Sequence, residues 1–264
     1  MRRRHTAIAA LFGMLMLSGC AGAPSSDSLD PNGESAGPGT ARPGLSGEVT
    51  VFAAASLRTA FDDIAELFEQ QHPQVDVKPI VYDGSSTLVT QLQEGARADV
   101  LATADERSMQ LLVDAGLASD AQLFATNTLV VAVPAGNPGG VDSLDDLANA
   151  VTVLCAPEVP CGVASTTLLD AAGVQVTAAS LEQNVTAVLE KVAAGEADAG
   201  LVYATDVIGD AAVDSFVPEG AADAVNRYPI VALDDADAAG IAFAEFVRRA
   251  EGQRVLHDLG FGAP

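Results

Sequence analysis

Four residues, three of them small or polar, occupy points where a predicted strand gives way to a predicted helix. Ser56 and Ser85 lie in the first half of the folded part. Cys161 and Val185 lie in the second half, where Val185 follows Asn184, a good N-cap. The N-terminus of a helix offers unpaired backbone N–H groups and about half a positive charge, and serine adds a hydroxyl donor. Together, the four positions could bind an anion.

Taken singly, each of these residues has an ordinary structural explanation. Ser56, Ser85 and Asn184 are also simple helix caps, and Cys161 could serve only as a disulfide partner. Tyr203, at the end of another predicted strand, could pack in the core with a hydrated hydroxyl. Their joint occurrence in one order is what favours a binding site.

The elements that would position these residues alternate along the chain from Glu48 onward. Short apolar runs predict strands, and apolar residues at three- and four-residue intervals predict helices. This alternation indicates an α/β fold with mostly parallel sheets, in which ligands bind beyond the carboxyl ends of strands. The predicted strands are 49–53, 75–82, 99–102, 127–134, 151–155, 199–203 and 230–233, and the predicted helices lie around 61–68, 88–92, 109–115, 143–150, 162–172, 185–194 and 238–259.

The number of these elements fits two similar lobes with a cleft between them. We expect the chain to cross between lobes in the long apolar strand near 127–133 and to return near 229–232. Lobe I would then hold residues 47–126 plus 233–264, and lobe II residues 127–232. Two crossings make a hinge, and hinged lobes can close on a ligand.

The N-terminus has the features of a secretory signal. Arginines at positions 2–4 precede a mostly apolar run at 7–17, which has about half the length needed to span a bilayer. Residues 17–20 (LSGC) resemble a bacterial lipobox, which implies that residues 1–20 form a lipoprotein signal peptide and that Cys20 becomes lipidated. The alternative is an ordinary signal cleaved nearby, with Cys20 incidental.

Residues 21–46 predict a flexible tether. Fourteen of these twenty-six residues are Gly, Pro or Ser, and large apolar side chains are almost absent. Such a segment buries too little surface to offset its chain entropy, and as a flexible coil it would span roughly 30 Å. We therefore expect an extracytoplasmic protein held by a lipid at the outer face of the cell membrane.

Composition and charge limit the partners of the remaining 218 residues. The chain of 264 residues is 49% hydrophobic, which fits a globular fold, and its net charge is −23. Loss of the signal arginines takes the charge to about −26, which argues against nucleic acid or an anionic membrane surface as a partner. Because charges are screened beyond about 10 Å at ordinary salt, an anion site requires only local positive potential.

Two cysteines besides Cys20 lie six positions apart, at Cys155 and Cys161. In an exported protein this pair predicts a disulfide, which would stabilise the fold by roughly 2 kcal/mol on the chain-entropy model. Their spacing and the positions of His72 and His257 match no zinc or haem motif. We therefore expect no metal-cation site.

Five segments give the chain a resemblance to a known family. They occur in the family's order and spacing at 51–57 (VFAAASL), 85–88 (SSTL), 98–105 (ADVLATAD), 157–162 (PEVPCG) and 200–203 (GLVY). The chain thereby resembles the periplasmic molybdate-binding proteins of ABC importers. The resemblance implies a two-lobed periplasmic-binding-protein fold with mostly parallel sheets, two crossover strands and a ligand cleft between the lobes.

The resemblance also implies a set of ligand residues. In that family two serine hydroxyls with backbone amides, two further backbone N–H groups and one tyrosine hydroxyl hold the oxyanion. These fall on Ser56, Ser85, Cys161, Val185 and Tyr203. The chain departs from the family pattern at Cys161, where many relatives have alanine, and at 184–186 (NVT), where relatives often have Asp-Val-Arg.

The function implied by the resemblance is that of the extracytoplasmic binding component of an ABC importer. The protein would bind molybdate, and also tungstate, through neutral donors and without a cofactor. As a monomer it would deliver the anion to a membrane permease driven by an ATPase. Sulfate is the nearest rival ligand, because it is a smaller tetrahedral dianion with the same bonding needs, and the size of the cavity would decide between them.

Two other classes of protein compete with this hypothesis. A serine hydrolase needs a base near its nucleophile, yet the mature chain has only His72 and His257. It also has no Gly-x-Ser-x-Gly elbow, Walker loop or dinucleotide fingerprint, so we do not expect an enzyme. The second alternative is a lipoprotein that binds a partner protein and no small ligand, which ligand-dependent thermal stability would distinguish.

Overall fold

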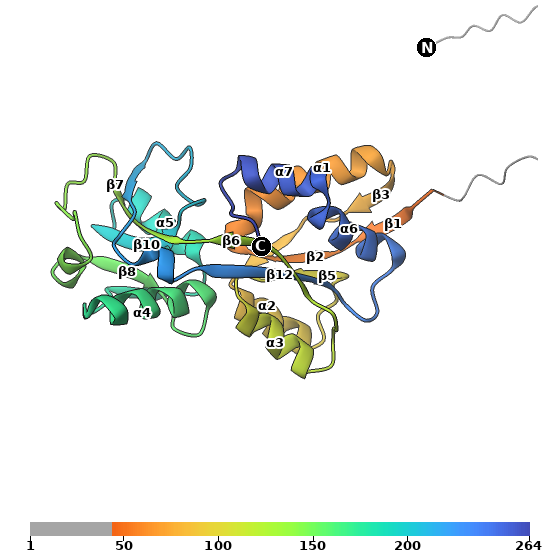
Figure 1. Ribbon diagram of the computed structural model, residues 1–264, viewed down its shortest axis with the longest axis horizontal. Coiled ribbons are helices and arrows are strands. Elements are labelled where there is room, and N and C mark those ends of the chain that lie inside the picture. Colours follow the sequence, from red (N-terminus) through yellow and green to blue (C-terminus); the bar gives the residue numbers. More distant parts are fainter. Residues whose placement is uncertain (1–43) are drawn as a thin grey trace, which may run out of the picture. The chain divides into compact units, whose positions relative to one another are not determined.

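Two five-stranded sheets form the framework of residues 44–264, the residues that the computed structural model describes. Figure 1 shows helices on both faces of each sheet, as an α/β fold requires. The predicted signal peptide, Cys20 and most of the predicted tether lie outside the described residues. Among the described residues, no helix is both long and apolar enough to span a membrane.

The first lobe is built on the sheet β4-β2-β5-β12-β6. β2 runs parallel to β4 and β5, and β12 runs antiparallel to β5 and β6, so four of the five strands point the same way. Helices α1, α6 and α7 lie on one face of the sheet and α2 and α3 on the other (Figure 1). The bounds are Val51–Ala54 for β2, Val81–Asp83 for β4, Val100–Ala102 for β5, Gln122–Asn127 for β6, Asn226–Ala232 for β12, Arg58–Gln71 for α1, Ser85–Gln93 for α2, Glu106–Asp114 for α3, Ala238–Arg248 for α6 and Ala250–Asp258 for α7.

The second lobe repeats this arrangement in the sheet β11-β7-β10-β8-β9. β8 runs parallel to β9 and β10, and β7 runs antiparallel to β10 and β11. Four strands therefore again point the same way, and β7 points the opposite way. Helices α4 and α5 cover opposite faces (Figure 1). The bounds are Leu129–Pro134 for β7, Thr152–Cys155 for β8, Ser180–Glu182 for β9, Ala199–Tyr203 for β10, Val213–Phe216 for β11, Pro160–Ala172 for α4 and Val185–Ala193 for α5.

Aromatic side chains fill the core on the α1 face of the first sheet. Phe61 and Phe68 of α1 are fully buried, as their helical spacing predicts. The ring of Phe61 lies 5.8 Å from that of Phe124 and 6.2 Å from that of Phe243, between centroids. These contacts fix α1, which begins directly after the turn that holds Ser56, against the sheet.

The predicted strand 75–82 is wrong, because it is two strands in different sheets. β3 (Gln74–Val77) pairs with β1 (Ser46–Val49) in a separate two-stranded sheet, and β4 pairs with β2. Pro79 lies between them. Proline has no N–H to donate, which explains the interruption of the ladder at this point.

Two predicted helices are also shorter than expected. The segment 143–150 forms only the 3-10 helix Asp145–Ala148, and β8 follows from Thr152. The terminal helix 238–259 breaks at Arg249, whose backbone is extended at φ −78° and ψ 170°. The short strands β9 and β11 were not predicted, since neither has more than one buried residue.

The two crossings between lobes differ in how well the sequence predicts them. The apolar segment 127–134 does cross, since β6 ends at Asn127 in the first sheet and β7 begins at Leu129 in the second. The predicted return near 229–232 is wrong, because β12 pairs with β5 and β6 from Asn226 onward. Residues 226–232 thus belong to the first sheet, where the buried ring of Tyr228 packs against Phe124.

Candidate functional site

One small cavity brings the predicted site residues together. The first lobe contributes Ser56 and Ser85, and the second contributes Cys161, Val185 and Tyr203. The volume of the cavity is about 10 Å³, enough for about one water molecule. The other lining residues are Ala54, Ala55, Asp83, Gly84, Ala104, Pro160 and Asn184.

Ser85 is the first residue of α2 and is almost fully buried. Its hydroxyl oxygen accepts a hydrogen bond from the backbone N–H of Ala104 at 2.9 Å. This bond uses a lone pair of the oxygen and leaves the hydroxyl proton free for another acceptor. Ser85 is therefore held in place as a donor.

Ser56 lies in the 3-10 turn Ala55–Leu57 that leads from β2 into α1. Its hydroxyl oxygen lies 3.0 Å from that of Tyr228, at hydrogen-bonding distance. Tyr228 was not predicted as a site residue, and no motif in the sequence singles it out. Because either hydroxyl could donate, Tyr228 can orient Ser56 with its proton toward the cavity.

Tyr203 ends β10 with its side chain fully buried. Its hydroxyl is the one buried side-chain polar atom of the described residues without a hydrogen-bond partner. Burial raises the pKa of this hydroxyl well above its ordinary value, and the neighbouring Tyr228 adds to the shift. Tyr203 thus keeps its proton at neutral pH and can donate it to a ligand.

The second lobe contributes two helix N-termini. Cys161 is the second residue of α4 and forms the predicted disulfide with Cys155 at the end of β8. Val185 is the first residue of α5, and the side-chain oxygen of Asn184 caps this helix by accepting from the N–H of Ala187 at 3.0 Å. Both helices present free backbone N–H groups at their first turns.

Charged side chains are sparse around this cavity. None of the residues that line it is basic, and Asp83 is the one acidic residue among them. Arg58, in the first turn of α1, stacks on the ring of Tyr82 with 4.3 Å between its Cζ and the ring centroid, outside the cavity lining. The positive potential here comes from helix N-termini and hydroxyl dipoles.

Asp206 follows Tyr203 closely and accepts its backbone N–H at 2.9 Å. Burial raises the pKa of this carboxyl to about 7, although the bond from Tyr203 acts in the opposite direction. Burial raises the pKa of both Tyr203 and Tyr228, and the negative charge of Asp206 adds to both shifts.

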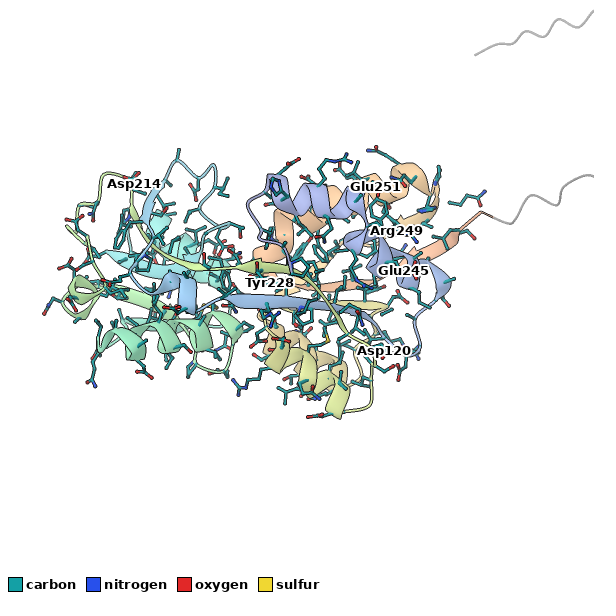
Figure 2. The ribbon with its side chains drawn as sticks, viewed as in Figure 1. Asp120, Asp214, Tyr228, Glu245, Arg249 and Glu251 are labelled. Carbon is teal, nitrogen blue, oxygen red and sulfur yellow. A yellow bond between two sulfur atoms is a disulfide. The ribbon has the colours of Figure 1, made fainter. Side chains whose placement is uncertain are left out.

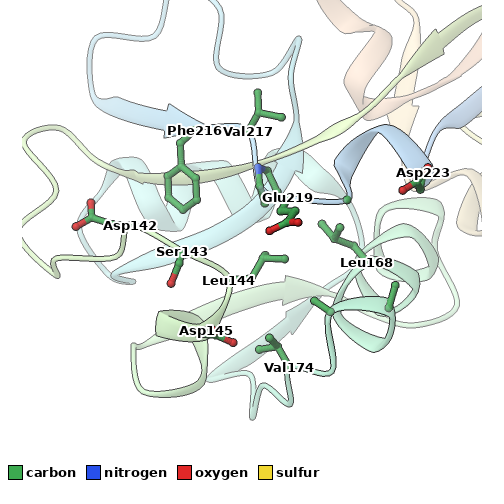
Figure 3. Close-up of a pocket in the computed structure, with 14 residues that line it drawn as sticks. Asp142, Ser143, Leu144, Asp145, Leu168, Val174, Phe216, Val217, Glu219 and Asp223 are labelled. Atoms are coloured by element: carbon green, nitrogen blue, oxygen red, sulfur yellow. The ribbon is translucent and has the colours of Figure 1, made fainter.

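A larger cavity lies in the second lobe, away from these residues (Figure 3). Its volume is about 630 Å³ and its lining includes Asp142, Asp145, Glu219 and Asp223. None of the five predicted residues lines it. The lining has four carboxylates and no basic residue, and these negative charges would repel an anion. This cavity therefore does not fit the predicted oxyanion ligand. Within residues 44–264, no His, Cys, Asp and Glu side chains are grouped in a way that could hold a metal ion.

Comparison with known proteins identifies the family. A model described as bacterial extracellular solute-binding protein matches residues 49–262. The chain belongs to this family. The molybdate-binding protein ModA of Mycobacterium tuberculosis is 44% identical to this solute-binding protein over 223 residues, which cover 82% of this chain and 85% of that protein.

Solved structures confirm the predicted two-lobed fold of this solute-binding protein. The periplasmic molybdate-binding protein of Azotobacter vinelandii matches with a TM-score of 0.70 at 21% identity, over 82% of this chain and 99% of that chain. The sulfate-binding protein SubI of Mycobacterium tuberculosis matches with a TM-score of 0.69 at 17% identity, over 81% of this chain and 86% of that chain. Since the two structures have different ligands in their names, the fold alone does not select the anion.

Proposed function

We propose that this protein binds molybdate or tungstate in the cavity lined by Ser56, Ser85, Cys161, Val185 and Tyr203. It then delivers the anion, as a monomer, to an ABC permease and its ATPase. The observation that carries this proposal is the buried Tyr203 hydroxyl, a donor without a partner that lines the same cavity as two serine hydroxyls and two helix N-termini.

The chemistry of the lining supports an oxyanion. Molybdate is fully deprotonated at neutral pH and needs donors alone, which hydroxyls and backbone N–H groups supply. A hydrogen bond to a charged acceptor is worth about 1.5–3 kcal/mol, so five or more such bonds could account for the roughly 8 kcal/mol of micromolar affinity or better. A basic side chain is not required.

The sequence relatives support the choice of anion. The ModA protein, 44% identical, is a molybdate-binding protein by name, and four of the five motifs carry a predicted ligand residue and span both lobes. Tungstate has the same charge and shape as molybdate, so we include it. Sulfate remains the rival that an experiment must exclude.

Two lobes joined by two crossings suit a protein that closes on its ligand. We propose lobe I as residues 47–126 plus 226–264, which takes in the strand β12, and lobe II as 127–225. Because both lobes line the cavity, closure would bring the two halves of the donor set onto the anion.

We also propose that Cys20 carries a lipid and that residues 21–46 tether the folded part to the outer face of the cell membrane. The signal-like N-terminus and the LSGC sequence at 17–20 support this attachment. The membrane partner would then be the lipid bilayer through the anchor alone.

Thermal unfolding with added anions tests the proposed function. The midpoint of the full-length protein should rise with sodium molybdate or tungstate concentration, because a ligand that binds only the folded state stabilises it. Sodium sulfate and sodium phosphate at the same ionic strength serve as controls. A midpoint that rises with sulfate and not with molybdate would replace the proposed ligand, and no rise with any anion would favour a protein that binds only a partner protein.

A further inference from the structure

A hydrogen bond joins the two lobes beside the cavity. The side-chain Nδ2 of Asn184 donates to Oδ1 of Asp83 at 3.0 Å. Asp83 is the last residue of β4 in the first lobe, and Asn184 immediately precedes α5 in the second. Both residues line the cavity that also holds the proposed ligand residues. We refer to Asp83 and Asn184 as the interlobe pair.

Each member of the interlobe pair is also bound to a helix start in its own lobe. Oδ1 of Asp83 accepts the backbone N–H of Gly84, the N-cap of α2, at 2.7 Å. Oδ1 of Asn184 accepts the N–H of Ala187 in the first turn of α5 at 3.0 Å. The bond between the pair therefore sets the position of the first turn of α2, with Ser85, relative to the first turn of α5, with Val185.

The backbones of the two lobes are in close contact at the same place. A Cβ atom added at Gly84 would overlap the carbonyl oxygen of Gln183 and would lie 3.1 Å from Cγ1 of Val159. Only glycine allows this approach without moving one lobe away from the other. The interlobe pair thus lies at a point where the lobes touch, rather than across a wide gap.

The carboxylate of Asp83 has no evident use as a ligand for the proposed anion. A carboxylate has no proton to donate at neutral pH and repels a dianion, and no basic residue in the cavity lining offsets its charge. Its two bonds, to Gly84 and Asn184, are both acceptor bonds at the junction of the lobes. This geometry accounts for an acidic residue beside an anion site.

We infer that Asp83 and Asn184 are positioning residues that hold the N-termini of α2 and α5 together across the junction of the lobes, and so slow the release of a bound oxyanion. This inference rests on the proposed function. The pair stabilises the closed arrangement of the two lobes and does not touch the anion itself. Loss of the pair should therefore act mainly on the dissociation rate.

The substitution Asn184→Asp tests the pair without removing the helix cap. Aspartate caps a helix as well as asparagine does, but it has no N–H₂ to donate and places a second carboxylate against Asp83. We expect the dissociation constant for molybdate to rise at least about tenfold, chiefly through faster dissociation. Gln175→Glu adds the same charge at an exposed position of the second lobe and should leave affinity within about twofold.

The double variant Asp83→Asn with Asn184→Asp exchanges the partners. The amide introduced at position 83 can then donate to the new carboxylate at position 184 while its oxygen still accepts from Gly84. Affinity should therefore return to within about threefold of the parent value. The measurements are calorimetric titration and stopped-flow dissociation with sodium molybdate, and the ligand-free unfolding midpoint reports folding separately.

The outcomes separate this inference from the function on which it rests. Unchanged or tighter binding in Asn184→Asp would overturn the pair, and so would a double variant that binds no better than the single one. If the unsubstituted protein binds neither molybdate nor tungstate, the proposed function fails, and the inference fails with it.

Discussion

At the scale of single residues, the proposed site is a set of neutral donors whose other bonds leave their protons available. Ser85 accepts from Ala104, and Ser56 lies against Tyr228 (labelled in Figure 2), while the hydroxyl of Tyr203 is unpartnered among the described residues. Sequence reasoning predicted the residue types at these positions. It did not predict Tyr228, because a contact between residues 172 positions apart leaves no local pattern.

The variant Tyr203→Phe should separate binding from stability. It removes one donor to the anion, so we expect molybdate affinity to fall about tenfold. The ligand-free unfolding midpoint should be unchanged or higher, because the lost hydroxyl is buried without a partner. Titration calorimetry and thermal unfolding measure the two quantities.

Tyr82→Phe is the matched control for that variant. The Tyr82 hydroxyl donates to Asp62 at 2.7 Å, outside the cavity lining. Its loss should lower stability by about 1 kcal/mol and leave affinity unchanged. If Tyr203→Phe bound molybdate as tightly as the parent protein, Tyr203 would not be a ligand.

Asp206 predicts a pH dependence of stability. Its pKa is about 7 in the folded protein, raised by burial from an ordinary value of 3.8. The folded state therefore keeps this proton where the unfolded state has lost it, and the stability from this group falls as pH rises from about 4 to about 7. Asp206→Asn resembles the protonated form. The stability of this variant should therefore exceed that of the parent protein by more at pH 8 than at pH 5.

Because Asp206 is partly exposed, we expect the variant to be more stable than the parent at pH 8 by about 1 kcal/mol, or roughly 2–4 °C in the thermal unfolding midpoint. Thermal unfolding of both proteins at the two pH values measures it. An equal difference at pH 5 and pH 8 would show that the carboxyl does not titrate in this range.

At the scale of elements, the helix starts were predicted better than the short strands. The strand-to-helix turns at Ser56, Ser85 and Val185 follow from apolar runs and caps in the sequence. The split of 75–82 at Pro79 and the exposed strands β9 and β11 did not follow, because pairing partners far away in the chain decide where a short strand forms. The sequence therefore predicts the turns of the proposed site, because these depend on local pattern.

The disulfide between Cys155 and Cys161 should support one of these helix starts. It closes the loop from β8 to the first turn of α4, which presents the backbone of Cys161 to the cavity. Replacing both cysteines by alanine should cost about 2 kcal/mol of stability and weaken molybdate binding about fivefold. Thermal unfolding and titration measure these effects, and the parent protein treated with a thiol reductant should reproduce them. An unchanged midpoint would contradict the stabilising role.

At the scale of the whole folded part, two sheets with the same strand order face one cavity. In each sheet one antiparallel strand, β12 or β7, separates an outer strand from three parallel ones. The sequence predicts the two lobes and the first crossing. It misplaces the second crossing, because the apolar pattern of 226–232 is equally suited to either sheet and only the pairing with β5 and β6 decides.

Attachment to the membrane also concerns the whole chain. If Cys20 carries the lipid, Cys20→Ala should move the protein from the membrane fraction of the producing cells to the soluble extracytoplasmic fraction. Metabolic labelling with a fatty acid should mark the parent protein and not the variant. Equal labelling of both proteins would contradict the proposed anchor.

Calorimetric titration of the full-length protein with sodium molybdate tests the central claim most directly. We predict one anion per chain with a dissociation constant of about 1 μM or tighter, close to the value for tungstate and much tighter than the values for sulfate and phosphate. Tight binding of sulfate with no heat from molybdate would contradict the proposal that this cavity is a molybdate site.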